Sequence, residues 1–430
     1  MNQSDCRRTV RFLKIAVLVL TGSALLPLAG AETRRVYRPT AAQLRLQEQS
    51  RQRQARIDAI RRQQAQQRPQ TRPVQPAVRA PQQPQQKNVP AVRPSVPAPS
   101  PKPAARPVQI RYIMHQGSRF VLLGDVARYY GMQVLPVKQG VTLKSPRDQI
   151  ALQFDKRQAA VNGTGIYLTC APLVKARQVY LDEKDFQLVI DPVIRNAPLA
   201  KHPVRTILID PGHGGKDKGA PGINGVLEKN IALTVAYQLA QRLGRMGYRV
   251  FMTRINDRTL SLQQRAAMCE KLKPDLFISV HCNSVTSNPK ANGIETYAMT
   301  PLGAASTADS KKGTQAGAGN AHDRNNYRLA YEVQKKLLFQ TKAADRGVRH
   351  ARFFVLRNAV CPAILIETGF LPHAKEGRQL NRKAYQEKLV TAIASGVTAY
   401  AAAVRPKNPP VQPKPAVKPA AKPAAKRPGK

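Results

Sequence analysis

The chain has 430 residues and a formal net charge of +45, with 70 Lys and Arg against 25 Asp and Glu. A protein this basic is attracted to polyanions, and nucleic acid is the first candidate. The basic segments near the two ends contain no stacking aromatic residue beyond Tyr37, which argues against a nucleic-acid-binding protein. The length is sufficient for more than one domain.

A secretory signal peptide is predicted for residues 1–31. Basic residues between positions 7 and 14 precede the apolar run IAVLVLTGSALLPLAG, and Ala29-Gly30-Ala31 has the small residues of a cleavage site. The run is short for a bilayer crossing and is interrupted at positions 21–23, so no stable membrane anchor is expected. The protein is therefore predicted to be exported, with the periplasm favoured over the cell wall or the medium.

Two segments, residues 32–107 and 405–430, are predicted to be disordered and basic. The first is dominated by Arg, Gln and Pro, and the second repeats Lys, Pro and Ala without an acid. Neither can bury enough apolar surface to offset the loss of chain entropy. After export, the anions within reach are carboxylate-rich peptidoglycan, teichoic acids and anionic phospholipid. Anionic envelope polymers, and no nucleic acid, are therefore the expected partners of these segments.

Residues 108–196 are predicted to form a small α+β domain. Short segments such as VQIRYIMH and QIALQF predict strands, Asn162-Gly163 predicts a turn, and residues 123–130 predict a helix. The order of these elements resembles the amino-terminal domain of copper amine oxidases, a module that also occurs in secreted wall-associated proteins. The resemblance implies no metal site here, and it leaves a ligand-binding role and an inert spacer equally open.

Residues 203–404 are predicted to form an α/β domain with a mostly parallel sheet covered by helices on both faces. Apolar runs stop at polar residues: ILID precedes Pro211-Gly212-His213, FISV precedes His281, and AILI precedes Glu367. Residues at the carboxyl ends of the strands of such a sheet meet in one crevice. Glu228 opens a stretch in which apolar residues recur every four positions, which predicts a helix starting at that carboxylate.

Two imidazoles and one carboxylate form a common protein ligand set for a catalytic zinc ion, and His213, His281 and Glu228 supply that set. Zinc lowers the pKa of a bound water from 15.7 to roughly 7, so that hydroxide forms at neutral pH. Glu367 would take the proton of this water and deliver it to a departing amine. Asp210 is a candidate hydrogen-bond acceptor behind His213, although an Asp before Pro-Gly is also ordinary turn chemistry.

These motifs, in this order, resemble those of a known family. The run ILIDPGHGGKDKGAPGINGVLEKNIAL, the pair Thr253-Arg254 with Asp257, and the later motifs SVHCN and ILIETGF resemble the zinc-dependent N-acetylmuramoyl-L-alanine amidases of the family-3 catalytic type. The resemblance covers about residues 204–404. It implies peptidoglycan as the substrate, cut between N-acetylmuramic acid and the L-alanine of the stem peptide for cell separation or wall turnover. It also implies one Zn²⁺ ion and assigns its ligands as His213, Glu228 and His281, with Glu367 as the catalytic glutamate.

Further residues of this domain are predicted to surround the site. Arg254 and Arg258 are candidates for binding stem-peptide carboxylates, and Asn283, the last residue of SVHCN, is a further substrate-binding candidate. The polar stretch of residues 299–326 is expected to border the site and to shape substrate access. The pairing of the cysteines is left open, including a Cys282–Cys361 disulfide. Because adjacent strand side chains point to opposite faces, Cys282 is not expected to share a metal with His281.

Two alternative functions remain open. A zinc peptidase would use the same ligands but would cut within the stem peptide or its cross-link. A non-catalytic cell-wall-binding protein would hold a structural metal or none, and it would have no use for the free carboxylate of Glu367. The need for an activator protein is also open. A monomer is expected, because no zipper-like apolar repeat occurs.

Overall fold

The computed structural model describes residues 108–195, 199–200, 202–285, 288 and 290–405. The predicted signal peptide, the predicted basic segment 32–107 and all of the carboxyl-terminal tail except residue 405 lie outside this part of the chain. Within the described ranges, no helix is both long and apolar enough to span a bilayer. These residues belong to one compact unit.

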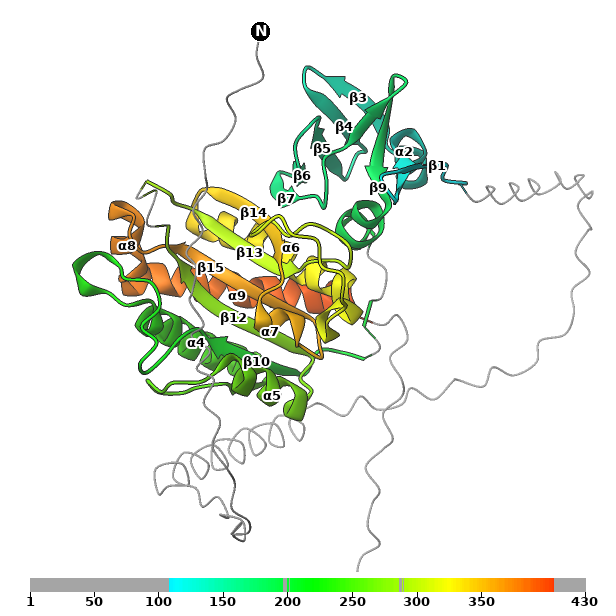
Figure 1. Ribbon diagram of the computed structural model, residues 1–430. Coiled ribbons are helices and arrows are strands. Elements are labelled where there is room, and N and C mark those ends of the chain that lie inside the picture. Colours follow the sequence, from blue (N-terminus) through cyan, green and yellow to red (C-terminus); the bar gives the residue numbers. More distant parts are fainter. Residues whose placement is uncertain (1–107, 196–198, 201, 286–287, 289, 406–430) are drawn as a thin grey trace, which may run out of the picture. The chain divides into compact units, whose positions relative to one another are not determined.

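The small amino-terminal region contains two antiparallel groups of strands and few helices (Figure 1). The turn predicted at Asn162-Gly163 connects two paired strands, and both residues have positive φ, 48° and 78°, as the tightest hairpin turns require. The predicted helix over residues 123–130 is also present. The elements are β1 (Tyr112–His115), β2 (Ser118–Leu122), α2 (Leu123–Tyr130), β3 (Gln133–Val137), β4 (Gly140–Lys144), β5 (Gln149–Gln153), β6 (Gln158–Val161), β7 (Thr164–Tyr167), β8 (Leu173–Lys175), β9 (Gln178–Asp182), a π-helix (Asp185–Ile190) and α3 (Asp191–Ile194).

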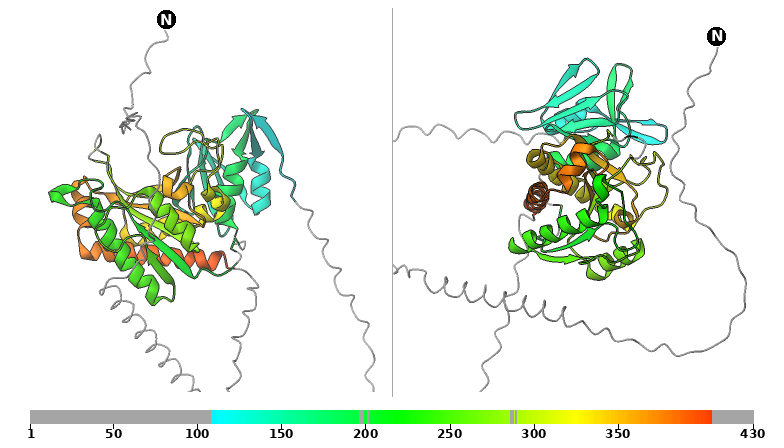
Figure 2. Two further views of the ribbon diagram at one scale, coloured as in Figure 1. Left: turned by 60° about the horizontal axis from the view of Figure 1, so that its bottom comes forward. Right: turned by 90° about the vertical axis from the view of Figure 1, so that its left-hand side faces the viewer.

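The larger region is an α/β fold whose sheet is covered by helices on both faces (Figures 1 and 2), as predicted. The apolar runs before the site residues form its central strands. The elements are β10 (Thr206–Pro211), a 3-10 turn (Ile223–Gly225), α4 (Glu228–Arg245), β11 (Arg249–Met252), α5 (Leu262–Leu272), β12 (Leu276–Asn283), β13 (Ile294–Met299), a second 3-10 turn (Ala318–His322), α6 (Asp323–Thr341), β14 (Asp345–Ala351), α7 (Phe354–Arg357), β15 (Ala363–Phe370), α8 (Ala374–Leu380) and α9 (Lys383–Ala403).

The sheet is mixed, which refines the prediction of a mostly parallel one. Strands β11, β10, β12 and β15 are parallel neighbours, whereas β13 is antiparallel to β15 and parallel to β14. Strand β7 of the small region pairs with β14 through Val348 and Ile166. The order is therefore β11-β10-β12-β15-β13-β14-β7-β6-β5-β4-β3, and the two predicted domains share one sheet.

The two faces of the central strands are covered unequally. Ile278, Val280 and Ile366 lie in the core cluster that includes residues of α4, α6 and α9. The alternate residues, such as Phe277 and Leu365, lie in a smaller cluster with residues of α5 and α7. Farther along this second face, His281 and Glu367 remain only half-buried. The site therefore opens on the face that the helices cover less completely.

The stretch of residues 299–326 does not border the site, and the prediction that it does is wrong. Strand β13 is antiparallel to β15, and Glu295 near its start pairs with Glu367 at the site. The end of β13 at Met299 therefore lies at the other end of the strands, away from the site. The stretch leaves from that end, where Gly317 and Gly319 approach the backbone of Leu356 and Arg357. The end of β12 at Asn283 and the start of β13 at Ile294 lie instead at the same end of the sheet as the site.

Candidate metal centre

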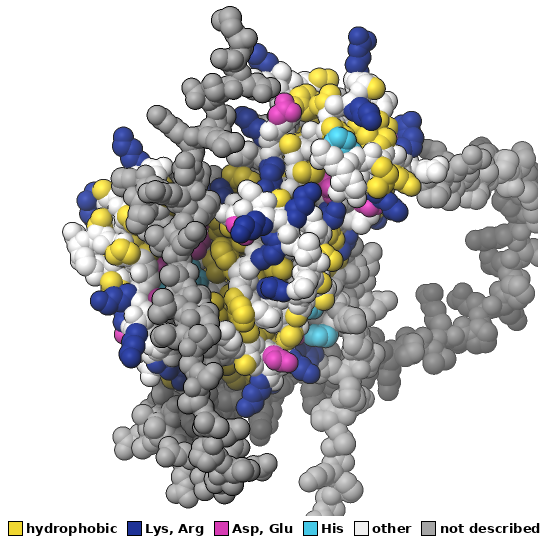
Figure 3. All heavy atoms as spheres, in the orientation of Figure 1, with side chains coloured by type: hydrophobic (Ala, Val, Ile, Leu, Met, Phe, Trp, Pro, Cys, Tyr) yellow, Lys and Arg dark blue, Asp and Glu magenta, His cyan; other side chains and the backbone are white. Residues whose placement is uncertain are grey.

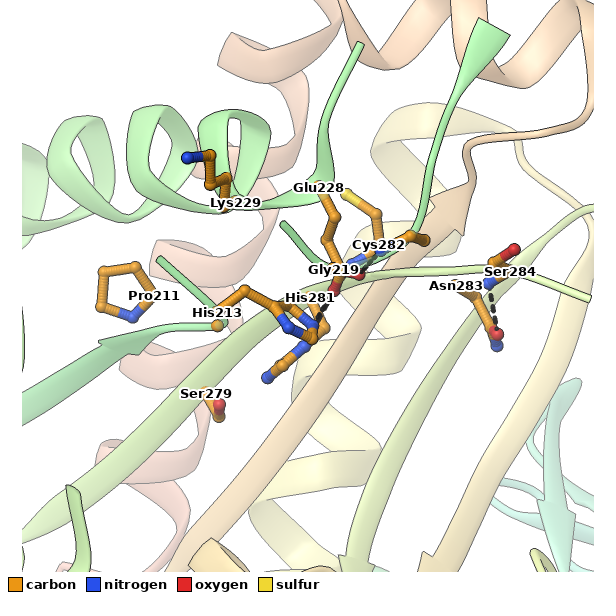
Figure 4. A network of polar contacts seen from close by, with 12 residues as sticks. Pro211, His213, Gly219, Glu228, Lys229, Ser279, His281, Cys282, Asn283 and Ser284 are labelled. Carbon is orange, nitrogen blue, oxygen red and sulfur yellow. Dashed lines mark hydrogen bonds and ion pairs between the residues drawn. The ribbon is translucent and has the colours of Figure 1, made fainter. Parts of the chain in front are cut away.

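The predicted metal ligands converge in the structure (Figure 4). Glu228 Oε1 lies 3.1 Å from His213 Nε2 and 2.9 Å from His281 Nδ1. One ligand atom from each of the three residues can be chosen so that all lie within 4.8 Å of one another. The two imidazole rings meet edge to face, with centroids 5.0 Å apart. Residues separated by up to 68 positions in the sequence therefore present donor atoms to one point.

Glycines make this approach sterically feasible. A Cβ atom on Gly212 would lie 2.5 Å from both ring nitrogens of His281. A Cβ atom on Gly219 would lie 2.6 Å from Glu228 Oε2 and 2.7 Å from His213 Cδ2, and Gly219 has a φ of +67°. His213 itself has a φ of +58°, a conformation uncommon for non-glycine residues. The loop after β10 is thus shaped around the ligand side chains.

His213 is oriented by Asp217, a residue that sequence reasoning missed. His213 Nδ1 lies 2.8 Å from Asp217 Oδ2, which leaves Nε2 directed at Glu228. Burial disfavours protonation of His213, but the Glu228 and Asp217 carboxylates outweigh it and raise the pKa of this imidazole. Burial likewise opposes ionisation of Glu228, yet its bonds with the two histidines hold the pKa of this carboxyl below its usual range. In the sequence, Asp217 is marked only by being an acidic residue four positions after His213.

Among the described residues, no hydrogen bond joins the Asp210 carboxylate to a side chain of the three predicted ligands. Asp210 is 1% exposed and accepts hydrogen bonds from Thr253 Oγ1 at 2.6 Å, Arg265 Nη1 at 2.6 Å and Ser279 Oγ at 2.9 Å. Arg265, which sequence reasoning also missed, donates onward to the carbonyl of His213 at 2.6 Å. Asp210 therefore supports the ligand loop through Arg265 and the backbone.

Arg254 has a similar role in the structure. It is 1% exposed, and its guanidinium donates to the carbonyls of Pro211 at 3.0 Å, Gly212 at 2.6 Å and Lys229 at 2.8 Å. These bonds tie the ligand loop to the first turn of α4, so we propose a positioning role for Arg254 in place of a substrate contact. Arg258 is exposed and donates to the carbonyl of Thr253, and its contact with substrate stays a prediction.

Glu367 lies on the strand beside the ligands. It is the register partner of His281 in the parallel pair β12–β15, so the two side chains leave the same face of the sheet. Its Oε2 is buried without a hydrogen-bond partner among the described residues. Burial, with smaller effects from the charges of Glu228 and Glu295, holds the pKa of Glu367 well above its usual range.

The cysteines lie outside the metal centre. Cys282 is buried in the core on the face opposite His281, as its place in the strand predicts. Its Sγ contacts Thr368 Oγ1 at 3.2 Å. The nearest thiol to Cys361 is that of Cys269, at 3.9 Å, so the structure favours Cys269 over Cys282 as its neighbour. All four cysteines among the described residues are free thiols here.

Comparison with known proteins places this site in a family. The family model for N-acetylmuramoyl-L-alanine amidase matches residues 207–399. The amidase AmiA of Escherichia coli (strain K12) is 31% identical over 220 residues, which cover 46% of this chain and 76% of AmiA. The amidase LytC of Bacillus subtilis (strain 168) is 36% identical over 202 residues, which cover 46% of this chain but only 36% of LytC. The solved amidase AmiC2 of Nostoc punctiforme is 34% identical, covering 47% of this chain and 97% of AmiC2, with a TM-score of 0.39.

Fold and site together define a hydrolase of the α/β class with a histidine- and glutamate-rich centre. The chain belongs to the N-acetylmuramoyl-L-alanine amidase family. The predicted amidase family and enzyme class are thereby confirmed, whereas the zinc ion stays a prediction. The family match begins after the small region, so the resemblance of residues 108–196 to a copper amine oxidase domain stays a prediction.

Proposed function

We propose that this protein hydrolyses the amide bond between N-acetylmuramic acid and L-alanine in peptidoglycan. The observation that carries the proposal is the convergence of His213, Glu228 and His281 next to Glu367, on the open face of the sheet. AmiA and LytC, whose names state this amidase activity, support the choice of bond.

One zinc ion fits the three converging residues. Two imidazole nitrogens and a carboxylate oxygen are donors that zinc accepts, and three protein ligands leave one position for water or substrate. The glycines at positions 212 and 219 keep the space between the donors clear of side chains. When bound, zinc supplies Lewis-acid activation of the attacking water and of the amide carbonyl.

The protein residues then have separate tasks. Asp217 fixes the ring of His213, while Arg254 and Arg265 hold the carbonyls of the loop that carries it. Glu367 removes a proton from the attacking water and delivers it to the alanine nitrogen, because an amine is a far better leaving group once protonated. The burial that raises the pKa of Glu367 makes its carboxylate a stronger proton acceptor than an exposed one.

The test is digestion of purified peptidoglycan by the full chain, followed by mass spectrometry of the products. We expect stem peptides with a free L-alanine amino terminus, lost on chelation and restored by zinc. Products cut farther along the peptide would establish the alternative zinc peptidase. Glu367→Gln should lower turnover by about 10²–10⁴-fold while binding zinc as the wild type does. A Glu367→Gln protein with full turnover would exclude the proposed mechanism.

We propose the cell envelope as the place of action, for cell separation or wall turnover. The sequence supports export and a periplasmic location through the predicted signal peptide. The basic charge supports retention on anionic envelope polymers, and Lys and Arg side chains are spread over the face shown in Figure 3. Binding to isolated cell walls that falls steeply with salt would support retention by charge. A monomeric state and the need for an activator protein stay predictions to be measured in the same assays.

A further inference from the structure

The polar row of the metal centre continues along the sheet beyond Glu367. Glu295 on β13 is the antiparallel partner of Glu367, so both side chains project from one face. The next strand, β14, brings two guanidinium groups to this carboxylate. Nε of Arg346 and Nε of Arg349 lie 2.9 Å and 3.1 Å from Glu295 Oε2. The row therefore begins with the predicted metal ligand on β12, continues with one carboxylate on β15 and one on β13, and ends with two arginines on β14.

Glu295 is fixed in place by its neighbours. It is 2% exposed, and its Oε1 accepts hydrogen bonds from Asn283 Nδ2 at 2.5 Å and from Tyr297 Oη at 2.9 Å. Asn283, predicted to bind substrate, thus donates its amide to this carboxylate. One carboxylate faces two guanidinium groups, so the cluster keeps an excess positive charge. That charge lies beside a site whose proposed substrate carries carboxylates.

The two arginines are engaged to different degrees. The Arg349 side chain is 16% exposed, and it also donates to the carbonyl of Arg346 at 3.2 Å and to Tyr167 Oη at 3.0 Å. The Arg346 side chain is 30% exposed and lies over the ring of Phe370 at 4.8 Å. Its Nη1 donates to the carbonyl of Asn292 at 3.5 Å, whereas its Nη2 has no acceptor among the described residues. Both arginines line a cavity of about 300 Å³ at the junction of β14 with β6 and β7.

The orientation of the substrate across the sheet follows from the proposed role of Glu367 as the proton donor to the leaving nitrogen. The leaving nitrogen must lie within hydrogen-bond reach of Glu367. That nitrogen begins the stem peptide, so the peptide starts on the β15 side of the ligands, and the sugar lies on the β10 side. Strands are spaced by about 4.8 Å, which puts β14 roughly 10 Å beyond β15. An extended peptide advances about 3.3–3.6 Å per residue, so about three residues cover this distance.

We propose that Arg346, held by Glu295 and Phe370, binds a free carboxylate of the stem peptide two to four residues beyond the cleaved bond, with Arg349 as a positioning residue. The inference rests on the proposed amide cleavage and deepens it by naming a feature of the substrate. Nε of Arg346 is engaged by Glu295 and Nη1 by the carbonyl of Asn292, which leaves the two N–H groups of Nη2 for a substrate carboxylate.

The experiment compares matched muramoyl-peptides in which the stem carboxylates are free or amidated. We expect Arg346→Gln to lower kcat/KM about 10- to 100-fold for the free-acid substrate and little for the amidated one. Arg346→Lys should recover part of the preference, because it keeps the charge but not the fork. Arg242→Gln is the matched control, since Arg242 is an arginine of similar exposure, 37%, that pairs with Glu387 on another surface.

Binding is measured in parallel in the Glu367→Gln background, which separates recognition from cleavage. There, the added Arg346→Gln change should weaken the Kd for the free-acid ligand selectively. Equal losses for both ligands would mean that Arg346 is structural, and a selective loss in Arg258→Gln instead would move the subsite to Arg258; either overturns the inference. Wild-type protein that cuts neither substrate, but binds the free-acid form selectively through Arg346, would instead count against the proposed function alone.

Discussion

At both ends of the central strands, arginine side chains hold loops by donating hydrogen bonds to backbone carbonyls, but the two loops have different roles. At the site end, buried Arg254 and Arg265 donate to backbone carbonyls of the loop that carries His213. At the opposite end, Arg157 donates to the carbonyl of Ala305 at 2.7 Å, and Arg352 donates to that of Lys311 at 2.7 Å. The arginines at the site end thereby fix the loop of the proposed metal site. Those at the opposite end fix the stretch of residues 299–326, and Arg157 ties it to the small region. In a chain this basic, an arginine in a motif indicates substrate binding only where its guanidinium is left accessible.

The largest effect is expected where the ligand loop has no room for a side chain. In Gly212→Ala the new Cβ would lie 2.5 Å from both ring nitrogens of His281, so the imidazole must move away from Glu228. We expect zinc affinity to fall about 10- to 100-fold and turnover by at least about 100-fold. Zinc titration and peptidoglycan digestion measure the two effects.

The control for this change is Gly244→Ala, in the last turn of α4. No atom lies within 4 Å of a Cβ placed on Gly244. Alanine is favoured over glycine by roughly 0.5–1 kcal/mol in a helix interior and by less in the last turn, so this variant should be at least as stable as the wild type and fully active. Equal zinc affinity in Gly212→Ala and Gly244→Ala would show that the loop does not constrain the ligands as the structure indicates.

The second effect compares the arginines of the two ends directly. Arg265→Met leaves the buried carboxylate of Asp210 without its ion partner, which should cost about 3–5 kcal/mol of unfolding free energy and also weaken zinc binding. Arg352→Met removes donors only from the carbonyls of Ala304 and Lys311. It should cost about 1–2 kcal/mol and leave zinc binding unchanged. Urea unfolding with zinc titration distinguishes them, and a loss of zinc affinity in Arg352→Met would break the contrast.

The parts that sequence predicted correctly are those encoded locally. The places of His213, His281 and Glu367 at the ends of strands are predictable because each follows or ends an apolar run, which is a clear pattern. Glu228 was found because the four-residue spacing after it marks a helix start. The convergence of all four residues then follows from the α/β architecture, in which the carboxyl ends of parallel strands share one edge.

The parts that were missed depend on contacts between distant segments. The segment IETYAM predicts a strand but not its direction, and the reversal of β13 alone moves the stretch of residues 299–326 away from the site. Arg265 lies in a helix whose pattern reveals nothing of its bond to Asp210, 55 residues away. Glu295 likewise becomes a neighbour of Glu367 only through the antiparallel pairing. Strand direction and buried ion pairs depend on tertiary contacts, which the spacing of residues along the chain does not reveal.

The last prediction concerns the end of the sheet opposite the site and is tested through pH. His350 is fully buried there, and burial, assisted by the charge of Arg157, lowers its pKa to about 3. In the unfolded chain the pKa of histidine is about 6.5, so below that pH the unfolded state binds a proton that the native state does not. This group therefore contributes stability above pH 6.5 that is lost progressively toward pH 3. Between pH 7 and pH 5 the loss is about 2 kcal/mol.

The quantity to measure is the difference in unfolding free energy between wild type and His350→Gln. The wild type alone is not sufficient, because Asp185 changes stability with pH in the opposite direction. Burial raises the pKa of Asp185 to about 7, so the native state keeps a proton that the unfolded chain releases above about pH 4, and stability from this group grows as pH falls. The two slopes nearly cancel in the wild type between pH 4 and 6.5. His350→Gln removes only the histidine, so its deficit relative to wild type should shrink by about 2 kcal/mol between pH 7 and pH 5. Urea unfolding at both pH values measures this, and a constant deficit would show that His350 binds a proton in the native state as readily as in the unfolded chain.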